Sequence, residues 1–289
     1  MTKTAFIGLG VMGYPMAGHM VANGHDVTVY NRTGAKSEKW AAEHDGNAAA
    51  TPAQAAAGAD VVCACVGNDD DLRSVVYGDD GILAGMKSGA IFVDHTTASA
   101  DVAREVAEKA DDLGIRFIDA PVSGGQAGAE NGKLTVMCGG EQGPFDEAKP
   151  IMESYAQAVT LLGPVGSGQL CKMVNQICIA GLVQGLAEGI NFGTKAGLDM
   201  NKVIDVISKG AAQSWQMENR ASTMINDEFE FGFAVDWMRK DLGICFEESK
   251  NNGARLPVTA LVDQFYAGVQ AKGGNRWDTS SLLRMLTKD

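Results

Sequence analysis

The sequence is poor in the residues that build disulfide frameworks and metal sites. Its 289 residues include only four histidines and six cysteines. The cysteines stand at positions 63, 65, 138, 171, 178 and 245, and they form neither a Cys-x-x-Cys pair nor a cluster with histidine. We therefore expect no metal site, and free thiols in a reducing cytosol.

Long apolar runs and excess positive charge are also lacking. No window approaches about 18 uncharged apolar residues, so no membrane span is expected. The N-terminus runs directly into a predicted strand and leaves no room for a signal peptide, which predicts a cytoplasmic protein. The formal net charge of −12 argues against a nucleic-acid partner. An anionic ligand must then be held by local positive groups.

The segments that are present indicate an α/β protein with two domains. Strand-like and helix-like segments alternate up to residue 164, which predicts a parallel, doubly wound sheet. From 168 to 196 there is no proline, and apolar residues recur near every 3.6 positions. This pattern predicts one helix of about 29 residues and roughly 43 Å, followed by an all-α domain.

The predicted elements follow from hydrophobic periodicity and turn residues. Strands are expected at 4–7, 25–30, 60–66, 90–94, 115–119, 134–138 and 158–162. Helices are expected at 36–43, 69–77, 99–113, 144–155, 168–196, 201–209, 215–225, 236–251 and 258–272, with Ser99 as an N-cap.

A Gly-x-Gly-x-x-Gly motif follows the first apolar run. It comprises Gly8, Leu9, Gly10, Val11, Met12 and Gly13, and an amphipathic stretch comes after it. A strand that turns through small residues into a helix directs unpaired N–H groups at one point, where a pyrophosphate can bind. Alone, the motif is equally consistent with an ordinary glycine-rich turn.

The second predicted strand ends in Asn31-Arg32-Thr33 and not in a carboxylate. A carboxylate there would accept hydrogen bonds from a free ribose 2′-hydroxyl and repel a 2′-phosphate. Arginine has the opposite preference, through a charge-assisted fork to phosphate. These residues predict NADP(H) in preference to NAD(H), with Lys36 as a further positive charge. The alternative is a solvated loop arginine.

Three later clusters are candidates for the chemistry. Ser123, Gly124 and Gly125 close the segment 119–125 just beyond a predicted strand, where a small anion can approach backbone N–H groups. Lys172, Asn175 and Gln176 share one polar face near the start of the long helix, where a desolvated lysine suits proton transfer. Lys240 and Asp241 open a later helix. Taken singly, each cluster is better explained in an ordinary way: as a Pro/Gly loop, as a solvated lysine and as a charged helix face.

Together these residues resemble the β-hydroxyacid dehydrogenase family, which includes 3-hydroxyisobutyrate dehydrogenase, tartronate semialdehyde reductase and the glyoxylate/succinic semialdehyde reductases. Four motifs appear in order across nearly the whole chain: 8–13 with Pro15-Met16, 119–125, 168–176 and 240–242. The resemblance implies a dinucleotide-binding Rossmann domain at 1–164 and a helical substrate and dimerisation domain at 165–289. It also implies an active site in the cleft between them.

The resemblance further implies a role for each matching residue. Lys172 would be the catalytic acid/base. The substrate carboxylate would be bound by Ser123, Gly124 and Gly125, with Asn175 orienting the substrate and Lys240 near the nicotinamide. Further cofactor contacts would come from Val66, Gly67 and Thr97. Val66-Gly67 departs from the Leu-Pro pair usual in the family, and His19 replaces a common Asn.

The leading interpretation is an NADP(H)-dependent oxidoreductase of a small hydroxy acid or semialdehyde acid, similar to 3-hydroxyisobutyrate dehydrogenase. A glyoxylate/succinic semialdehyde reductase is the close alternative, favoured by Asn31-Arg32-Thr33. Lys172 argues against an imine reductase, and an intact site argues against a non-catalytic cofactor-binding scaffold. We expect a homodimer or homotetramer. Trp215, Met217 and Trp237 lie in the helical half and are candidates to line the substrate pocket, but ordinary core packing is the favoured expectation for each.

Overall fold

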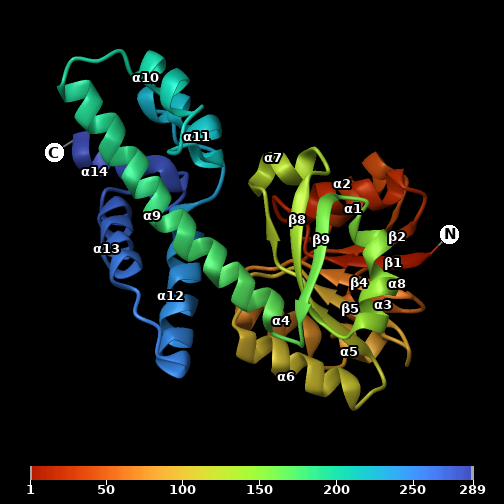
Figure 1. Ribbon diagram of the computed structural model, residues 1–289. Coiled ribbons are helices and arrows are strands. Elements are labelled where there is room, and N and C mark those ends of the chain that lie inside the picture. Colours follow the sequence, from red (N-terminus) through yellow and green to blue (C-terminus); the bar gives the residue numbers. More distant parts are fainter. Residues whose placement is uncertain (1, 288–289) are drawn as a thin grey trace. The chain divides into compact units, whose positions relative to one another are not determined.

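We describe residues 2–287 of the protein from a computed structural model (Figure 1). The chain divides into two compact units, one ending at Lys172 and the other beginning at Met173. The first is an α/β unit and the second is helical. This order of architectures is the one that the sequence predicted.

The first unit is built on a single sheet with the strand order β3-β2-β1-β4-β5-β6-β8-β7, and β9 pairs with β8. All pairs from β3 to β6 are parallel. The order 3-2-1-4-5-6 is that of dinucleotide-binding Rossmann sheets. The strands are β1 (Lys3–Ile7), β2 (Asp26–Tyr30), β3 (Asn47–Ala48), β4 (Val61–Ala64), β5 (Ile91–Asp94), β6 (Arg116–Asp119), β7 (Val122–Ser123), β8 (Leu134–Gly140) and β9 (Ala156–Gly163).

Helices cover both faces of this sheet, because successive side chains of a strand point to opposite faces. In β1, Phe6 belongs to the core formed with α1, α2, α7 and α8. Its neighbours Ala5 and Ile7 belong to the core formed with α3 to α6. The helices are α1 (Gly13–Ala22), α2 (Gly34–His44), α3 (Pro52–Ala56), α4 (Asp69–Val76), α5 (Ile82–Gly85), α6 (Ala100–Asp111), α7 (Gly125–Glu130) and α8 (Gln142–Met152).

The predicted parallel sheet is confirmed from β3 to β6, but the strands beyond β6 make the sheet mixed. β8 runs antiparallel to both β6 and β7, while β9 runs parallel to β8. The connection from β7 to β8 contains only the short α7, so the chain returns beside the strands it has just left, whereas a parallel pair needs a longer crossover. Figure 1 shows β8 and β9 side by side at this end of the sheet.

The long helix is confirmed, with α9 spanning Ser167–Lys195 over 29 residues. By length and composition alone α9 could cross a membrane. This is weak evidence, because the central helix of a protein core passes the same test. The buried face of its second half, including Ala180, Val183 and Ile190, packs in the core of the second unit.

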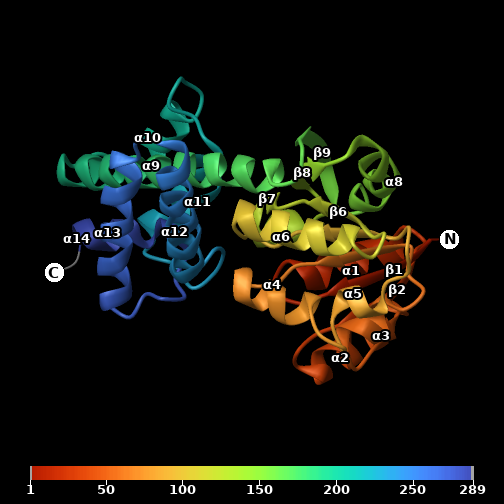
Figure 2. The same ribbon diagram turned by 90° about the horizontal axis from the view of Figure 1, so that it is seen from below.

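The second unit packs helices that are shorter than α9 around that half of α9, as Figures 1 and 2 both show. They are α10 (Met200–Ile207), α11 (Trp215–Ile225), α12 (Val235–Asn252), α13 (Pro257–Ala271), the 3₁₀ helix η1 (Thr279–Leu283) and α14 (Arg284–Thr287). Buried Asp278 accepts hydrogen bonds from the backbone N–H groups of Phe233 and Ser280, and its carboxylate pairs with Arg220.

The long predicted elements are confirmed, with ends that differ by a few residues. Ser99 caps α6 as expected, since its hydroxyl oxygen accepts a hydrogen bond from the Val102 N–H. The sequence did not predict β3, β7, α3, α5, α7, η1 or α14. Each spans six residues or fewer, too short for a periodic pattern to emerge.

Candidate active site

The loops that carry the predicted cofactor and substrate residues leave the same edge of the sheet. The cofactor candidates follow β1, β2, β4 and β5 in turn, and the segment after β6 carries Ser123 in β7 and Gly124 and Gly125 at the start of α7. The strands β1, β2, β4, β5 and β6 are parallel. Parallel strands present their carboxyl ends at one edge, which is where doubly wound folds bind ligands. The candidate residues of the first unit therefore lie at the edge of the sheet where folds of this kind bind ligands.

Two glycines of the first loop are required by the fold. Gly8 has a φ of +95°, and a Cβ added there would lie 2.3 Å from the Cys65 carbonyl oxygen. A Cβ added at Gly13 would lie 2.0 Å from the Gly8 carbonyl oxygen. By contrast, a Cβ at Gly10 would meet nothing within 4 Å. Packing thus explains why positions 8 and 13 are glycine. It does not require glycine at position 10, where the open space can admit a ligand.

The start of α1 fits a bound pyrophosphate. Met12 occupies the N-cap position and makes no side-chain capping hydrogen bond. The turn is held by the backbone, with the Tyr14 N–H donating to the Gly10 carbonyl oxygen at 3.2 Å. A helix N-terminus with no side-chain cap leaves N–H groups for an anion. Leu9 is buried and Val11 is exposed beside this turn.

Asn31 binds the glycine loop itself. Its Oδ1 accepts a hydrogen bond from the Leu9 N–H at 3.0 Å, and its Nδ2 donates to the Thr33 carbonyl oxygen at 3.2 Å. Arg32 is 88% exposed and its Nη1 lies 3.5 Å from Asp71 Oδ1 on α4. Thr33 is the N-cap residue of α2. Asn31 therefore couples the two loops, a role that the sequence did not reveal.

The loops after β4 and β5 are joined to each other. The Val66 N–H donates to Thr96 Oγ1 at 3.1 Å. Gly67 follows Val66 in the loop, and Thr97 follows Thr96. The fully buried Thr96 was not among the predicted site residues, although it fixes the loop that carries Thr97.

Gln169 connects the loop after β5 to the first turn of α9. Its Nε2 donates to the Thr96 carbonyl oxygen at 2.7 Å, and its Oε1 accepts from the Ala98 N–H at 3.1 Å. The side chain is buried and both ends of its amide are satisfied. Thr97 is thereby held between two residues that are fixed to the helix carrying Lys172.

Asp119 at the end of β6 anchors the beginning of that helix. Its two carboxylate oxygens accept hydrogen bonds from the N–H groups of Gly166 at 2.7 Å and Gln169 at 2.9 Å. A Cβ added at Gly168 would lie 2.3 Å from the Met137 carbonyl oxygen, so glycine permits this close approach. Burial raises the pKa of Asp119 to about 6. The sequence singled out the segment 119–125 but did not assign this role.

Lys172 lies next to the segment 123–125, which the sequence predicts to bind the substrate. Its Nζ donates to the Val122 carbonyl oxygen at 2.9 Å, one residue before Ser123, and Lys172 is only 7% exposed. The loop then turns through Gly124, with a φ of +130°, and Gly125, with a φ of +62°. Glycine is the residue that adopts such angles without strain. A buried ammonium and a backbone able to approach an anion are therefore neighbours.

Two further buried groups lie beneath this edge of the sheet. Asp94 pairs in register with Asp119 and accepts a hydrogen bond from the Thr96 N–H at 3.0 Å. Burial raises the pKa of Asp94 to about 7 and lowers the pKa of His95 to about 4. His95 Nδ1 lies 2.7 Å from the Ala120 carbonyl oxygen, which can only accept, so Nδ1 carries the proton.

The second unit groups the remaining candidates around Asp241. Asn175 Nδ2 donates to Gln176 Oε1 at 2.8 Å, and Gln176 Nε2 donates to Asp241 Oδ2 at 2.6 Å. Lys240 Nζ lies 2.9 Å from the other oxygen, Asp241 Oδ1. Asp241 is buried, so this ion pair and hydrogen bond hold Asn175 and Lys240 in one polar network.

The tryptophans of this unit correct one expectation. Met217 is buried in the core as expected, but Trp215 and Trp237 are 45% and 37% exposed. The Lys240 ammonium lies 6.0 Å from the centre of the Trp237 ring. Trp237 therefore borders the Lys240 network and is not an ordinary core residue.

The Rossmann strand order, the glycine loop and the helical unit define a class, that of NAD(P)-binding oxidoreductases. Residues 3–163 match the family model of the NAD-binding domain of 6-phosphogluconate dehydrogenase. Residues 166–286 match the model described as NAD-binding of NADP-dependent 3-hydroxyisobutyrate dehydrogenase. The chain belongs to the β-hydroxyacid dehydrogenase family, and it is an NAD(P)-dependent hydroxyacid dehydrogenase.

Whole-length relatives agree with this placement. An uncharacterized oxidoreductase of Shewanella frigidimarina is 67% identical, covering 100% of this chain and 99% of that protein. The 2-hydroxy-3-oxopropionate reductase of Escherichia coli is 32% identical, covering 98% and 97%. The structure of the Mycobacterium tuberculosis 3-hydroxyisobutyrate dehydrogenase with L-serine matches with a TM-score of 0.88 at 30% identity, covering 99% of both chains.

Proposed function

We propose that the protein reduces a small semialdehyde acid, or oxidises the corresponding hydroxy acid, with Lys172 as the general acid/base. The observation that carries the proposal is the buried Lys172 ammonium beside the Ser123 loop. A bound nicotinamide supplies or accepts the hydride at the substrate carbon. In reduction Lys172 gives a proton to the forming alkoxide, and in oxidation its neutral form takes the hydroxyl proton.

The substrate carboxylate is assigned to Ser123, Gly124 and Gly125. Positive φ angles at both glycines turn the backbone so that a small anion can approach its N–H groups. Asn175 orients the substrate and Lys240 serves the nicotinamide end, both supported by the network around Asp241. L-serine, present in the related Mycobacterium tuberculosis structure, is itself a 3-hydroxy acid. This supports a 3-hydroxyisobutyrate dehydrogenase-like activity.

The cofactor proposed is NADP(H) in preference to NAD(H). The pyrophosphate is assigned to the loop Gly8–Gly13, the adenosine ribose to Asn31, Arg32 and Thr33, and further contacts to Val66, Gly67 and Thr97. Arg32 is 88% exposed at the edge of the sheet where such folds bind ligands, and its guanidinium has the geometry to form a fork with a phosphate. One matching family model also describes an NADP-dependent enzyme.

A glyoxylate/succinic semialdehyde reductase is the second candidate. The residues Asn31-Arg32-Thr33 favour it, and the Escherichia coli relative carries the name of an aldehyde-acid reductase. We also propose that the cofactor-binding domain ends at residue 164 and that the substrate and dimerisation domain begins at residue 165. The proposed assembly is a homodimer or homotetramer. Cytoplasmic location stays a prediction from the sequence.

One experiment separates these candidates. The consumption of NADPH and of NADH is followed with methylmalonate semialdehyde, tartronate semialdehyde, glyoxylate and succinic semialdehyde. The proposal predicts reduction of at least one acid, with a larger kcat/KM for NADPH than for NADH. The acid with the largest kcat/KM distinguishes the two candidates. Tight NADPH binding without turnover of any acid would instead support the scaffold alternative.

A further inference from the structure

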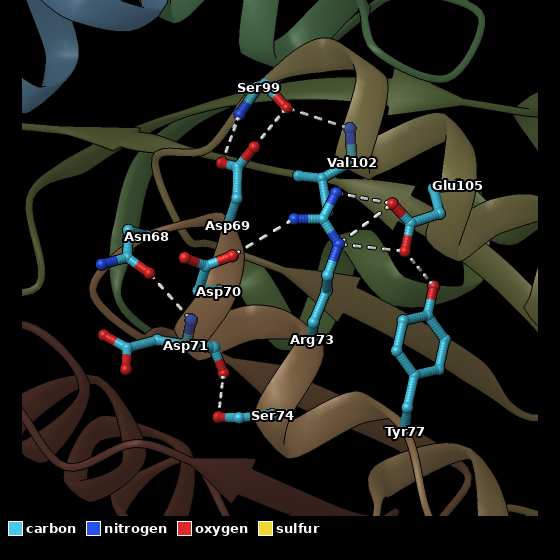
Figure 3. A network of polar contacts seen from close by, with 10 residues as sticks. All are labelled: Asn68, Asp69, Asp70, Asp71, Arg73, Ser74, Tyr77, Ser99, Val102 and Glu105. Atoms are coloured by element: carbon cyan, nitrogen blue, oxygen red, sulfur yellow. Dashed lines mark hydrogen bonds and ion pairs between the residues drawn. The ribbon is translucent and has the colours of Figure 1, made fainter.

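Three consecutive aspartates open α4, and they differ in what they contact. Asp69 accepts hydrogen bonds from the N–H and hydroxyl of Ser99 at 2.9 and 2.5 Å. Asp70 lies 3.5 Å from Arg73 on the same helix. Figure 3 shows the Asp71 carboxylate directed away from this network, while the other two point into it. The backbone of Asp71 takes part in the network, but its carboxylate is the one of the three that the network does not use.

Asp71 contacts Arg32 from a different loop of the sheet edge. Asp71 Oδ1 lies 3.5 Å from Arg32 Nη1, and the two side chains are 34% and 88% exposed. The position of Asp71 is fixed by Asn68, whose Oδ1 accepts a hydrogen bond from the Asp71 N–H at 2.8 Å. The acid thus stands beside the arginine assigned to the 2′-phosphate.

We infer that Asp71 is a specificity-determining residue that weakens the preference for NADP(H). The inference rests on the proposed function, because it takes Arg32 as the phosphate ligand. An Arg32 guanidinium shared with Asp71 is less available to a 2′-phosphate. The 2′-phosphate also meets the negative charge of Asp71, whereas a 2′-hydroxyl does not. The ion pair therefore lowers the ratio of kcat/KM for NADPH to that for NADH, so that NAD(H) remains a usable cofactor.

The size of the effect follows from the exposure of the pair. Exposed ion pairs are weak and screened by salt, but a phosphate brings a larger charge than a single carboxylate. Replacing Asp71 by Asn should raise the ratio of kcat/KM for NADPH to that for NADH about three- to tenfold. The gain should lie in a lower KM for NADPH, and it should shrink in about 1 M salt.

Asp70→Asn provides a matched control. It removes the same charge from the adjacent residue, whose side chain is 96% exposed and faces Arg73. We expect Asp70→Asn to leave the cofactor ratio within about twofold of the parent. In an Arg32→Ala background, Asp71→Asn should raise the ratio less than it does beside Arg32. An equal gain from Asp70→Asn, or an undiminished gain without Arg32, would overturn the inference.

A binding measurement keeps the test independent of turnover. Dissociation constants of adenosine 2′,5′-bisphosphate and 5′-AMP are compared for the parent and Asp71→Asn by calorimetry. The inference requires tighter binding of the bisphosphate only, and unchanged binding of both would contradict it. The parent's own preference tests the proposed function separately. If the parent prefers NADH, the assigned NADP(H) preference fails, while the change caused by Asp71→Asn still decides the role of Asp71.

Discussion

The buried carboxyl of Asp94 should make the first unit less stable as the pH rises. In the unfolded chain this carboxyl ionises near its ordinary pKa of 3.8, whereas burial raises its pKa in the folded protein to about 7. Between these values the folded state binds more protons, so its stability falls with rising pH. Above about pH 7 both states are ionised and the dependence ends.

The magnitude comes from the same two values. The interval between 3.8 and about 7 corresponds to at most about 4 kcal/mol of stability. Asp94→Asn keeps the shape of the side chain and the carbonyl oxygen that can accept from the Thr96 N–H, but it cannot ionise. The variant should therefore gain stability relative to the parent between about pH 4 and pH 8, by about 2–4 kcal/mol.

The assay compares urea unfolding of the two proteins at several pH values, with hydrogen exchange of β5 reporting on the first unit. The difference between the proteins is the informative quantity, because His95 acts in the opposite direction. Burial lowers the pKa of His95 to about 4, so its contribution is lost as the pH falls below its ordinary value.

Asp101→Asn is the control for this comparison. Asp101 is 71% exposed and pairs with Arg104 at 3.0 Å on the surface. Asp101→Asn therefore removes an exposed carboxyl and leaves the buried Asp94 carboxyl in place. Parallel pH profiles of stability for the parent and Asp94→Asn would show that the Asp94 carboxyl does not carry the pH dependence. So would an Asp101→Asn profile that departs from the parent as much as the Asp94→Asn profile does.

Two further predictions, one on the glycine loop and one on Gln169, concern how the cofactor loops are held. Gly13→Ala should destabilise the first unit and weaken NADP⁺ binding, because the added Cβ would lie 2.0 Å from the Gly8 carbonyl oxygen. Gly10→Ala places its Cβ in open space, so it should preserve the unfolding midpoint and weaken only NADP⁺ binding. Gln169→Leu leaves the Thr96 carbonyl and the Ala98 N–H without this partner, which should cost about 1–3 kcal/mol and raise the Kd for NADP⁺. Calorimetry and urea unfolding measure both, with exposed Gln142→Leu as the control for the second. Unchanged NADP⁺ binding in Gly10→Ala or Gln169→Leu would contradict the assigned roles.

The fold was predictable where its elements are long and periodic. The 29 residues of α9 and the buried run of β4 carry clear patterns of burial, and parallel strands follow from their alternation with helices. The antiparallel β8 was not predictable from such a pattern. Its direction depends on the short connection through α7, whose six residues show no periodicity.

The sequence predicted which residues of the candidate site lie at the carboxyl edge of the sheet. It did not predict most of the contacts between them. Gly8, Ser123 and Lys172 belong to local motifs that can be read in the sequence. Asp119 and Gln169 act through hydrogen bonds to residues about 50 and 70 positions away, which no local pattern encodes. The pairing of Arg32 with Asp71 likewise arises only when β2 and β4 flank β1.

The same limit explains Asn31. The sequence assigned Asn31 to the cofactor ribose from its place after β2, and that assignment stays a proposal. The structure adds that the Asn31 amide is hydrogen-bonded to the backbone of Leu9 and Thr33. The motif alone did not reveal these loop contacts, because they depend on how β1 and β2 pair.

Proton transfer by Lys172 is decided by the turnover of Lys172→Ala. The parent, Lys172→Ala and the surface control Lys109→Ala are compared for kcat with the best acid substrate and for the dissociation constant of NADPH. If Lys172 moves the proton, kcat of Lys172→Ala falls about 10²-fold or more, while NADPH binding and the Lys109→Ala variant change little. Near-parental kcat in Lys172→Ala, with NADPH still bound, would contradict this role of Lys172.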